Sequence, residues 1–331
     1  MEKKLKVSVI GIGHLGNFHC KVLRANQDVE FAGVYDILPE RTQKGAEDYL
    51  CTGFSSLAEC INNSDALIIA VPTSVHFEVA KECIDKQKHC FIEKPITEKV
   101  DEANKLIQLA EENKIKIQVG HIERFNPAFT SLHEFNIQPL FIEAHRLGQF
   151  KPRARDVSVI HDLMIHDIDI VLQLINSKIK KIDANGVSVL SETTDIANAR
   201  ITFENGAVAN LTASRISANQ MRKMRIFQKD AYISIDFLDH SAEVFNIIDS
   251  DKTHSAKLAT MLGSIDSNNT NRSIYYIKPE IIKTNAIEEE QKAFFDSILN
   301  NKKTAVDATA ATNALEVAEY ILKEIAEAKI D

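Results

Sequence analysis

Two carboxylates and a histidine recur at helical spacing in the stretch HDLMIHDID, residues 161–169. Asp162, His166 and Asp169 stand at positions i, i+4 and i+7, so on a helix they share one face. An imidazole flanked by carboxylates has a fixed tautomer and can exchange a proton near neutral pH. Oxidation of an alcohol needs such a base, because the hydroxyl proton must leave as hydride leaves the carbon. A divalent metal site and a charged helix face without chemistry remain alternatives.

A lysine follows the apolar run at 89–92 and stands between Glu93 and Pro95. At the end of a buried strand, an ammonium group can hydrogen-bond to a reacting hydroxyl and assist its proton loss. The alternative is a solvated loop lysine, because charged residues make up 26% of the chain. Lys94 is therefore a second candidate catalytic residue beside Asp162 and His166.

Three glycines at GxGxxG spacing, Gly11, Gly13 and Gly16, follow the first apolar run and open a helical pattern. In a strand–turn–helix unit, the first glycine permits a tight turn and the second lets the backbone approach a pyrophosphate. The third lets the helix pack against the strand. Because free N–H groups at a helix start attract phosphate oxygens, we also expect His14 and Leu15 at this site. The pattern predicts a dinucleotide-binding loop.

An acidic residue stands twenty positions after Gly16, where the second apolar run ends at Asp36. A carboxylate in this place can accept hydrogen bonds from the adenosine ribose, and it repels the 2′-phosphate of NADP. We therefore predict NAD as the cofactor. The alternative is an ordinary polar cap at the end of a strand.

The apolar run at 66–71 ends at Val71, and Pro72, Thr73 and His76 follow it. Ligands of an open parallel sheet bind beyond the carboxyl ends of its strands. We therefore expect these residues, together with Glu93 after the next strand, at the nicotinamide half of the cofactor. For His76, a surface position at the start of a helix is an equal alternative.

Strands and helices alternate in the first 120 residues. Wholly apolar strands are typical of a parallel sheet covered on both faces, so we predict a doubly wound α/β Rossmann domain over residues 1–123. The expected strands are 6–10, 30–35, 66–71, 89–92 and 116–119, with helices between them that include 74–87 and 98–113.

The pattern changes from residue 124 onward. Alternating runs and an Asn205-Gly206 turn signal predict antiparallel strands, so residues 124–331 read as an α+β domain with a largely antiparallel open sheet. The polar stretch Ser264–Ser273 is expected to be a loop. The expected elements are a helix at 158–176, strands at 194–203, 207–214, 224–228 and 232–237, and helices at 286–299 and 307–328.

Composition limits the partners. A formal net charge of −8 disfavours nucleic acid, and no apolar run reaches the roughly 18 residues of a membrane span. The five cysteines form no CxxC pair, and their odd number argues against a disulfide framework. We therefore expect a cytoplasmic protein with small-molecule ligands and neither a membrane nor a nucleic-acid partner.

The motifs GIGHLG, VPTSVH, EKP, GHIERF, DLMIHDID and FENGAVANL together resemble the Gfo/Idh/MocA oxidoreductases along nearly the whole chain. The resemblance implies a Rossmann domain followed by an α+β domain whose open sheet face makes a homodimer or homotetramer interface. It also implies that Lys94, Asp162 and His166 act at the substrate, with His166 as the acid/base and Lys94 at the nicotinamide ribose.

Arginines gather in two places in the second half of this acidic chain, and guanidinium groups suit phosphate or carboxylate ligands. The phrases GHIERFNPAF, DVSVIHDLMIHDID and LTASRIS resemble the subgroup that oxidises the 3-hydroxyl of UDP-N-acetylglucosamine. We therefore expect a nucleotide sugar bound by Arg153, Arg155, Asp169 and Arg225. A free sugar or inositol dehydrogenase and a non-catalytic NAD-bound regulator remain alternatives.

Overall fold

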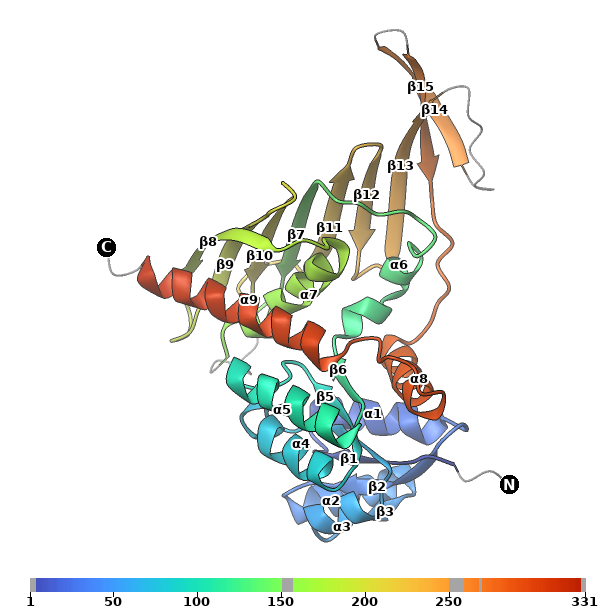
Figure 1. The fold of residues 1–331 in the computed structure, drawn as a ribbon, viewed down its shortest axis with the longest axis vertical. Helices are drawn as coiled ribbons and strands as arrows, with labels where there is room; N and C mark the ends of the chain where they lie inside the picture. Colours follow the sequence, from blue (N-terminus) through green and yellow to red (C-terminus); the bar gives the residue numbers. More distant parts are fainter. Residues whose placement is uncertain (1–3, 151–156, 250–258, 268–269, 329–331) are drawn as a thin grey trace. The chain divides into compact units, whose positions relative to one another are not determined.

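The computed structural model describes residues 4–150, 157–249, 259–267 and 270–328 (Figure 1). The chain forms two compact units. The first contains Met1–Ile122 and Asn285–Glu316, and the second contains Glu123–Thr284 and Val317–Asp331. We expected the segment Asn285–Glu316 in the second domain, but it clusters with the first because Phe294 and Phe295 enter the core of the first unit.

A six-stranded parallel sheet forms the first unit, in the order β3-β2-β1-β4-β5-β6. The strand order reverses between β1 and β4, and a doubly wound sheet binds its ligand at this point. The strands are β1 Lys6–Ile10, β2 Glu30–Tyr35, β3 Thr52–Gly53, β4 Ala66–Ile69, β5 His89–Glu93 and β6 Ile117–Gly120.

Helices cover both faces of this sheet. The face that carries Val7, Val9 and Phe91 packs against α1 and α8, and the Phe91 and Phe294 ring centroids lie 5.9 Å apart. The helices are α1 His14–Ala25, α2 Pro39–Tyr49, α3 Leu57–Asn62, α4 His76–Asp85, α5 Val100–Asn113 and α8 Ala286–Leu299, with a short 3-10 turn η1 at Thr73–Val75.

A nine-stranded sheet forms the second unit, in the order β14-β15-β13-β12-β11-β7-β10-β9-β8. Neighbouring strands run antiparallel except for the central pair β7 and β10, which are parallel. The strands are β7 Phe141–Leu147, β8 Ile179–Val187, β9 Ile196–Phe203, β10 Val208–Ser214, β11 Met221–Gln228, β12 Ala231–Asp236, β13 Ser241–Asp249, β14 Ala259–Ser267 and β15 Thr270–Ile277.

The two faces of this sheet differ in character. On one face, inward residues such as Ile142, Ala144 and Ile226 are fully buried. That face is covered by helices, whereas Phe227 on the other face is 40% exposed. The second unit contains the short turn η2 Ile122–Phe125, α6 Pro127–Thr130, a π-helical turn η3 Ile160–Met164, α7 Ile165–Leu174 and the later part of α9 Ala308–Glu327.

The predicted fold class is confirmed, and so is the hairpin at Asn205-Gly206, which joins β9 to β10. Two expectations change. The stretch Ser264–Ser273 was expected as a loop, but most of it belongs to β14 and β15, whose backbones pair along nearly their whole length. The helix expected over 158–176 begins with the π-helical turn. Of the described helices, none has the length and apolarity needed to cross a membrane.

Candidate active site

The glycine loop of the first unit has the geometry that the motif predicts. Gly11 has a φ of +86°, and a Cβ there would lie 2.7 Å from the Ala70 carbonyl oxygen. A Cβ at Gly16 would lie 1.9 Å from the Gly11 carbonyl oxygen, so only glycine lets α1 start here. A Cβ at Gly13, in contrast, would meet no atom within 4 Å. The backbone is therefore open to a ligand at Gly13.

A cavity of about 580 Å³ lies beside this loop and is mostly apolar. Because it borders the N-terminus of α1, phosphate oxygens bound there would meet free backbone N–H groups. Both the open backbone at Gly13 and this helix start fit a dinucleotide. Seven of the residues expected at the cofactor line the cavity, namely Gly11, Gly13, His14, Leu15, Asp36, Val71 and Pro72.

Asp36 has two roles in the structure. Its carboxylate accepts hydrogen bonds from the backbone N–H groups of Ile12, at 2.7 Å, and Leu38, at 3.0 Å. The side chain thereby holds the glycine loop against the end of β2, and it still borders the cavity. Arg41 lies 3.9 Å from the Asp36 carboxylate and lines the same cavity.

His76 does not line the cavity, although we expected it at the cofactor. Its side chain is 1% exposed, and its ring nitrogens lie 2.9 Å from the carbonyl oxygens of Pro95 and Val71. The ring therefore ties the loop after β4 to the loop after β5. Burial lowers the pKa of His76, while its two carbonyl partners oppose that shift. Thr73, on η1 in the loop after β4, is half-buried.

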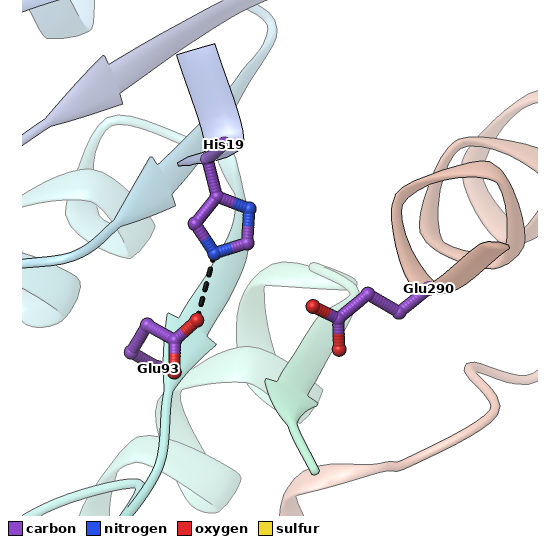
Figure 2. A group of neighbouring side chains, drawn as sticks. All are labelled: His19, Glu93 and Glu290. Atoms are coloured by element: carbon purple, nitrogen blue, oxygen red, sulfur yellow. Dashed lines mark hydrogen bonds and ion pairs between the residues drawn. The ribbon is translucent and has the colours of Figure 1, made fainter. Parts of the chain in front are cut away.

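Glu93 also turns away from the cavity, toward a buried group of polar side chains (Figure 2). Its Oε1 atom accepts a hydrogen bond from the Nε2 atom of His19 at 2.7 Å, and its Oε2 atom accepts one from the Lys94 backbone N–H at 3.2 Å. Lys94 itself is half-buried at the end of β5. The structure therefore separates these neighbours: Glu93 lies inside the unit, and Lys94 begins the loop.

The predicted catalytic helix lies in the second unit. Asp162 belongs to the π-helical turn η3, His166 to the first turn of α7, and both are half-buried. Asp169 is 1% exposed, and its carboxylate pairs with both Nε and a terminal nitrogen of Arg124, at 2.7 and 2.5 Å. This bidentate ion pair fixes Asp169 to Arg124 and holds α7 in place. Asp169 is therefore not proposed as a substrate contact.

A second arginine holds α7 from the sheet. Arg146, on the inward face of β7, donates two hydrogen bonds to Asp167 at 2.9 and 2.8 Å and one to Glu123 at 2.6 Å. Burial opposes the charge of Arg146, but Asp167 and Glu123 raise its pKa above the ordinary value. Burial also raises the pKa of Asp167, against the pull of Arg146. Arg222 adds a second positive charge 3.5 Å from Glu123.

Arg225 lies on the other face of this sheet from Arg146. Its guanidinium pairs with Glu143 at 3.0 Å, and Glu143 points away from the face on which α7 packs. Arg222, on the same strand as Arg225, lies on the α7 face, and its side chain is 46% exposed. Arg153 and Arg155 lie outside the described residues.

Family models match both halves of the chain. The model described as "Oxidoreductase family, NAD-binding Rossmann fold" matches residues 5–121, and the "GFO/IDH/MocA C-terminal domain" matches residues 132–234. A UDP-N-acetylglucosamine 3-dehydrogenase from Acidithiobacillus ferrooxidans is 40% identical over 243 residues, which are 73% of this chain and 77% of that relative. This chain belongs to the Gfo/Idh/MocA oxidoreductase family. It is an oxidoreductase with a NAD-binding Rossmann domain.

A solved structure of the same relative and a second relative extend the comparison. A solved structure of the Acidithiobacillus ferrooxidans UDP-N-acetylglucosamine 3-dehydrogenase has a TM-score of 0.86 and 33% identity, covering 97% of this chain and 98% of that one. The scyllo-inositol 2-dehydrogenase (NAD(+)) of Bacillus subtilis is 27% identical over 66% of this chain and 69% of its own length. The chain is therefore more similar to the nucleotide-sugar enzyme than to this inositol enzyme.

Three residues that shape these sites, Arg146, Glu290 and His19, were not predicted as site residues from the sequence. Arg146 could have been suspected, because it occupies the third inward position of a strand after Ile142 and Ala144. Glu290 carried a similar signal, since it precedes Phe294 by one helical turn on the buried face of α8. His19 carried none, because its partners are contributed by distant segments of the chain.

Proposed function

We propose that this oxidoreductase is a NAD-dependent dehydrogenase that oxidises the 3-hydroxyl of UDP-N-acetylglucosamine or a closely similar nucleotide sugar. One observation carries the proposal: the relative that is 40% identical over 77% of its length is a UDP-N-acetylglucosamine 3-dehydrogenase, whereas the inositol dehydrogenases named among the relatives are 23–28% identical over shorter matches. Retention of Lys94, Asp162 and His166 supports a catalytic rather than a regulatory role.

The residues around the cavity divide the work of holding the cofactor. The N-terminus of α1 and the open backbone at Gly13 receive the pyrophosphate, and Asp36 receives the adenosine ribose. Because the Asp36 carboxylate would repel a 2′-phosphate, we propose NAD rather than NADP. When bound, NAD supplies the acceptor for the hydride.

His166 is the proposed acid/base. In the oxidation, the O–H bond of the carbinol would give up its proton to His166 as hydride leaves the carbon, and a carbonyl group would remain. Asp162, one turn earlier, orients the imidazole and stabilises its charge after the proton arrives. Lys94 donates a hydrogen bond to the reacting oxygen and favours loss of its proton.

Positive charge on the second unit supports a nucleotide-sugar substrate. A UDP-sugar carries a diphosphate, which suits guanidinium groups. On the face that carries α7, Arg222 offers a partly exposed guanidinium, and we propose it as a diphosphate contact in place of Arg225. Arg153 and Arg155 keep the same proposed role.

We also propose that the enzyme is a homodimer or homotetramer that associates through the open face of the nine-stranded sheet. Aromatic rings form a continuous row across this face, with neighbouring centroids 5.0 to 5.9 Å apart. A row of partly exposed rings is typical of a protein interface. The row consists of Phe141, Phe227, Tyr232, Phe245 and Tyr276.

A substrate panel tests the proposal. The purified protein is given NAD and, separately, UDP-N-acetylglucosamine, UDP-glucose, free N-acetylglucosamine and myo-inositol, and NADH absorbance is followed. We expect NADH with UDP-N-acetylglucosamine and at least tenfold lower kcat/KM with the others. Equal turnover of free and UDP-linked sugars would overturn the nucleotide-sugar assignment. Tight NAD binding without any turnover would favour a regulator.

A further inference from the structure

Four buried polar side chains form a group in the first unit, where α1 and α8 meet the end of β5, just before Lys94. His19 comes from α1, Glu93 from β5, and Glu290 and Gln291 from α8; Figure 2 shows the first three converging. One ligand-type atom from each of His19, Glu93 and Glu290 lies within 4.8 Å of the others. None of the four lines the cavity beside Gly13, so the group does not bind the cofactor directly.

The hydrogen bonds of Gln291 define the protonation of His19. The Gln291 amide nitrogen lies 3.2 Å from the His19 backbone carbonyl, which can only accept, and 3.0 Å from the His19 Nδ1 atom. The Nδ1 atom therefore also accepts a hydrogen bond and carries no proton. The proton resides on Nε2, which donates to Glu93. His19 is thus a neutral imidazole in a fixed tautomer.

The two carboxyl groups of the cluster are not equivalent. Glu93 accepts hydrogen bonds on both oxygens, from His19 and from the Lys94 backbone, whereas the buried Oε2 atom of Glu290 has no hydrogen-bond partner among the described residues. Burial and the Glu93 charge raise the pKa of Glu290 well above the ordinary range. Burial also opposes ionisation of Glu93, but the hydrogen bond from His19 and the nearby Lys94 lower the pKa of Glu93. The cluster therefore holds one negative charge, on Glu93, beside a neutral Glu290.

A metal ion is a poor fit to this arrangement. A metal bound to Nε2 of His19 would need the lone pair of that atom, but the Gln291 contact places the ring proton there. Gly120 also restricts the space, since a Cβ at that position would lie 3.0 Å from the Glu93 carboxylate. The carboxylate is packed against the backbone of β6 and has fixed donors on both oxygens.

We propose that Glu93 is a positioning residue for Lys94: its carboxylate, anchored by the His19–Gln291 pair, accepts the Lys94 N–H and fixes the backbone from which the lysine ammonium is presented. Glu93 thus acts through Lys94 and does not contact the cofactor. This inference rests on the role given to Lys94 under the proposed function.

An asymmetric pair of amide substitutions tests the inference. Glu93→Gln leaves only one acceptor oxygen for two donors, so either His19 or the Lys94 N–H loses its partner. Glu290→Gln replaces a neutral acid by a neutral amide of the same shape. With the sugar that the wild-type enzyme oxidises best, we expect kcat to fall about tenfold to a hundredfold for Glu93→Gln and to stay within about twofold for Glu290→Gln.

A double-mutant cycle separates positioning from a merely structural effect. If Glu93 acts through Lys94, Glu93→Gln should lower kcat by no more than about twofold in a Lys94→Met background. Equal losses in both backgrounds, a matching loss for Glu290→Gln, or stoichiometric metal in the purified protein would each overturn the proposal.

A second pair of variants serves if Glu93→Gln fails to fold. His19→Gln keeps a hydrogen-bond donor toward Glu93, whereas His19→Leu removes it. Only His19→Leu should then lower kcat.

The protonation of His19 provides a test that needs no turnover. Nitrogen-15 NMR of the imidazoles, assigned with His19→Gln, should show a His19 ring that carries its proton on Nε2 and none on Nδ1. An imidazolium or an Nδ1–H tautomer would overturn the proposed network, whatever the result of the substrate panel. A failed panel with the expected tautomer would count against the proposed substrate and leave the network in place.

Discussion

His166 is the residue on which the proposed chemistry depends most directly. The His166 imidazole is half-buried on the first turn of α7, and Asp162 precedes it by four residues on η3. Its sequence neighbour Asp167 is fully committed to Arg146. Of these two adjacent residues, Asp167 therefore has a structural task, whereas the task proposed for His166 is chemical.

Replacing His166 by asparagine should lower kcat about a hundredfold and change NAD affinity by less than about twofold, because only proton transfer is lost. Steady-state kinetics and fluorescence titration of NADH measure the two quantities. His161→Asn is the matched control, since His161 lies one turn away and pairs with Glu319 at 2.8 Å. An unchanged kcat for His166→Asn would remove His166 as the acid/base.

Glu290 makes a prediction about pH and stability. Burial raises the pKa of Glu290 above the ordinary value of 4.5, and the Glu93 charge raises it further. Glu290 therefore binds its proton more tightly in the folded state than in the unfolded state. That contribution is complete below about pH 4.5 and is lost as pH rises toward the folded-state pKa. Glu290→Gln cannot ionise and should therefore gain stability relative to the wild type as pH rises.

Urea unfolding of both proteins at a series of pH values from 4.5 to 8 measures this difference. Its slope should approach, at most, about 1.4 kcal/mol per pH unit in favour of Glu290→Gln. Parallel pH profiles would mean that Glu290 titrates normally. The groups that face it in the cluster, His19 and Glu93, are present in both proteins and should cancel.

Helix α7 is the element that carries His166, the proposed acid/base, and two arginines fix this helix. Arg146 binds Asp167 from β7, and Arg124 binds Asp169 from the η2 turn. Because these acidic residues lie two positions apart, their partners approach the helix from different sides. Rotation of α7 about its axis is thereby opposed, and His166 keeps its direction.

Arg146→Met should lower the free energy of unfolding of the second unit by about 3 kcal/mol or more, because it leaves Asp167 and Glu123 buried with less compensation. Arg225→Met removes an ion pair that lies on the open face of the same sheet and should cost at most about 1 kcal/mol. Urea titration followed by circular dichroism measures both variants. Similar losses for the two would mean that the Arg146 network contributes no more than an exposed pair.

Elements whose signals are local could be predicted from the sequence. Strand β1 and helix α8 have the predicted bounds, because an apolar run and a regular amphipathic pattern determine them. Five strands were not predicted, since their pairing depends on neighbouring strands rather than on their own residues. They are the two-residue strand β3 and the strands β8, β13, β14 and β15.

The same distinction applies to the sites. The glycine loop is encoded within six consecutive residues and is confirmed in the structure. His76, Glu93 and Asp169 were assigned to ligands, but each has a buried protein partner from a segment distant in sequence. Spacing along the chain shows which residues could do chemistry; only the folded contacts show which are already engaged.

At the scale of the whole molecule, the open face of the second sheet should hold subunits together. Phe227→Arg places a charge in the middle of the aromatic row and should convert the assembly to monomers, as measured by light scattering on a sizing column. Leu299→Ser, an exposed apolar residue of the first unit, is the control and should leave the mass unchanged. An unaltered oligomer in Phe227→Arg would place the interface elsewhere.

The central claim is that hydride leaves carbon 3 of a UDP-N-acetylamino sugar for NAD. We would measure it with UDP-N-acetylglucosamine that carries deuterium at carbon 3, beside a control labelled at carbon 4. We expect deuterium in the reduced dinucleotide and slower turnover only for the carbon 3 label. Label transfer from carbon 4, or no transfer from either position, would contradict it.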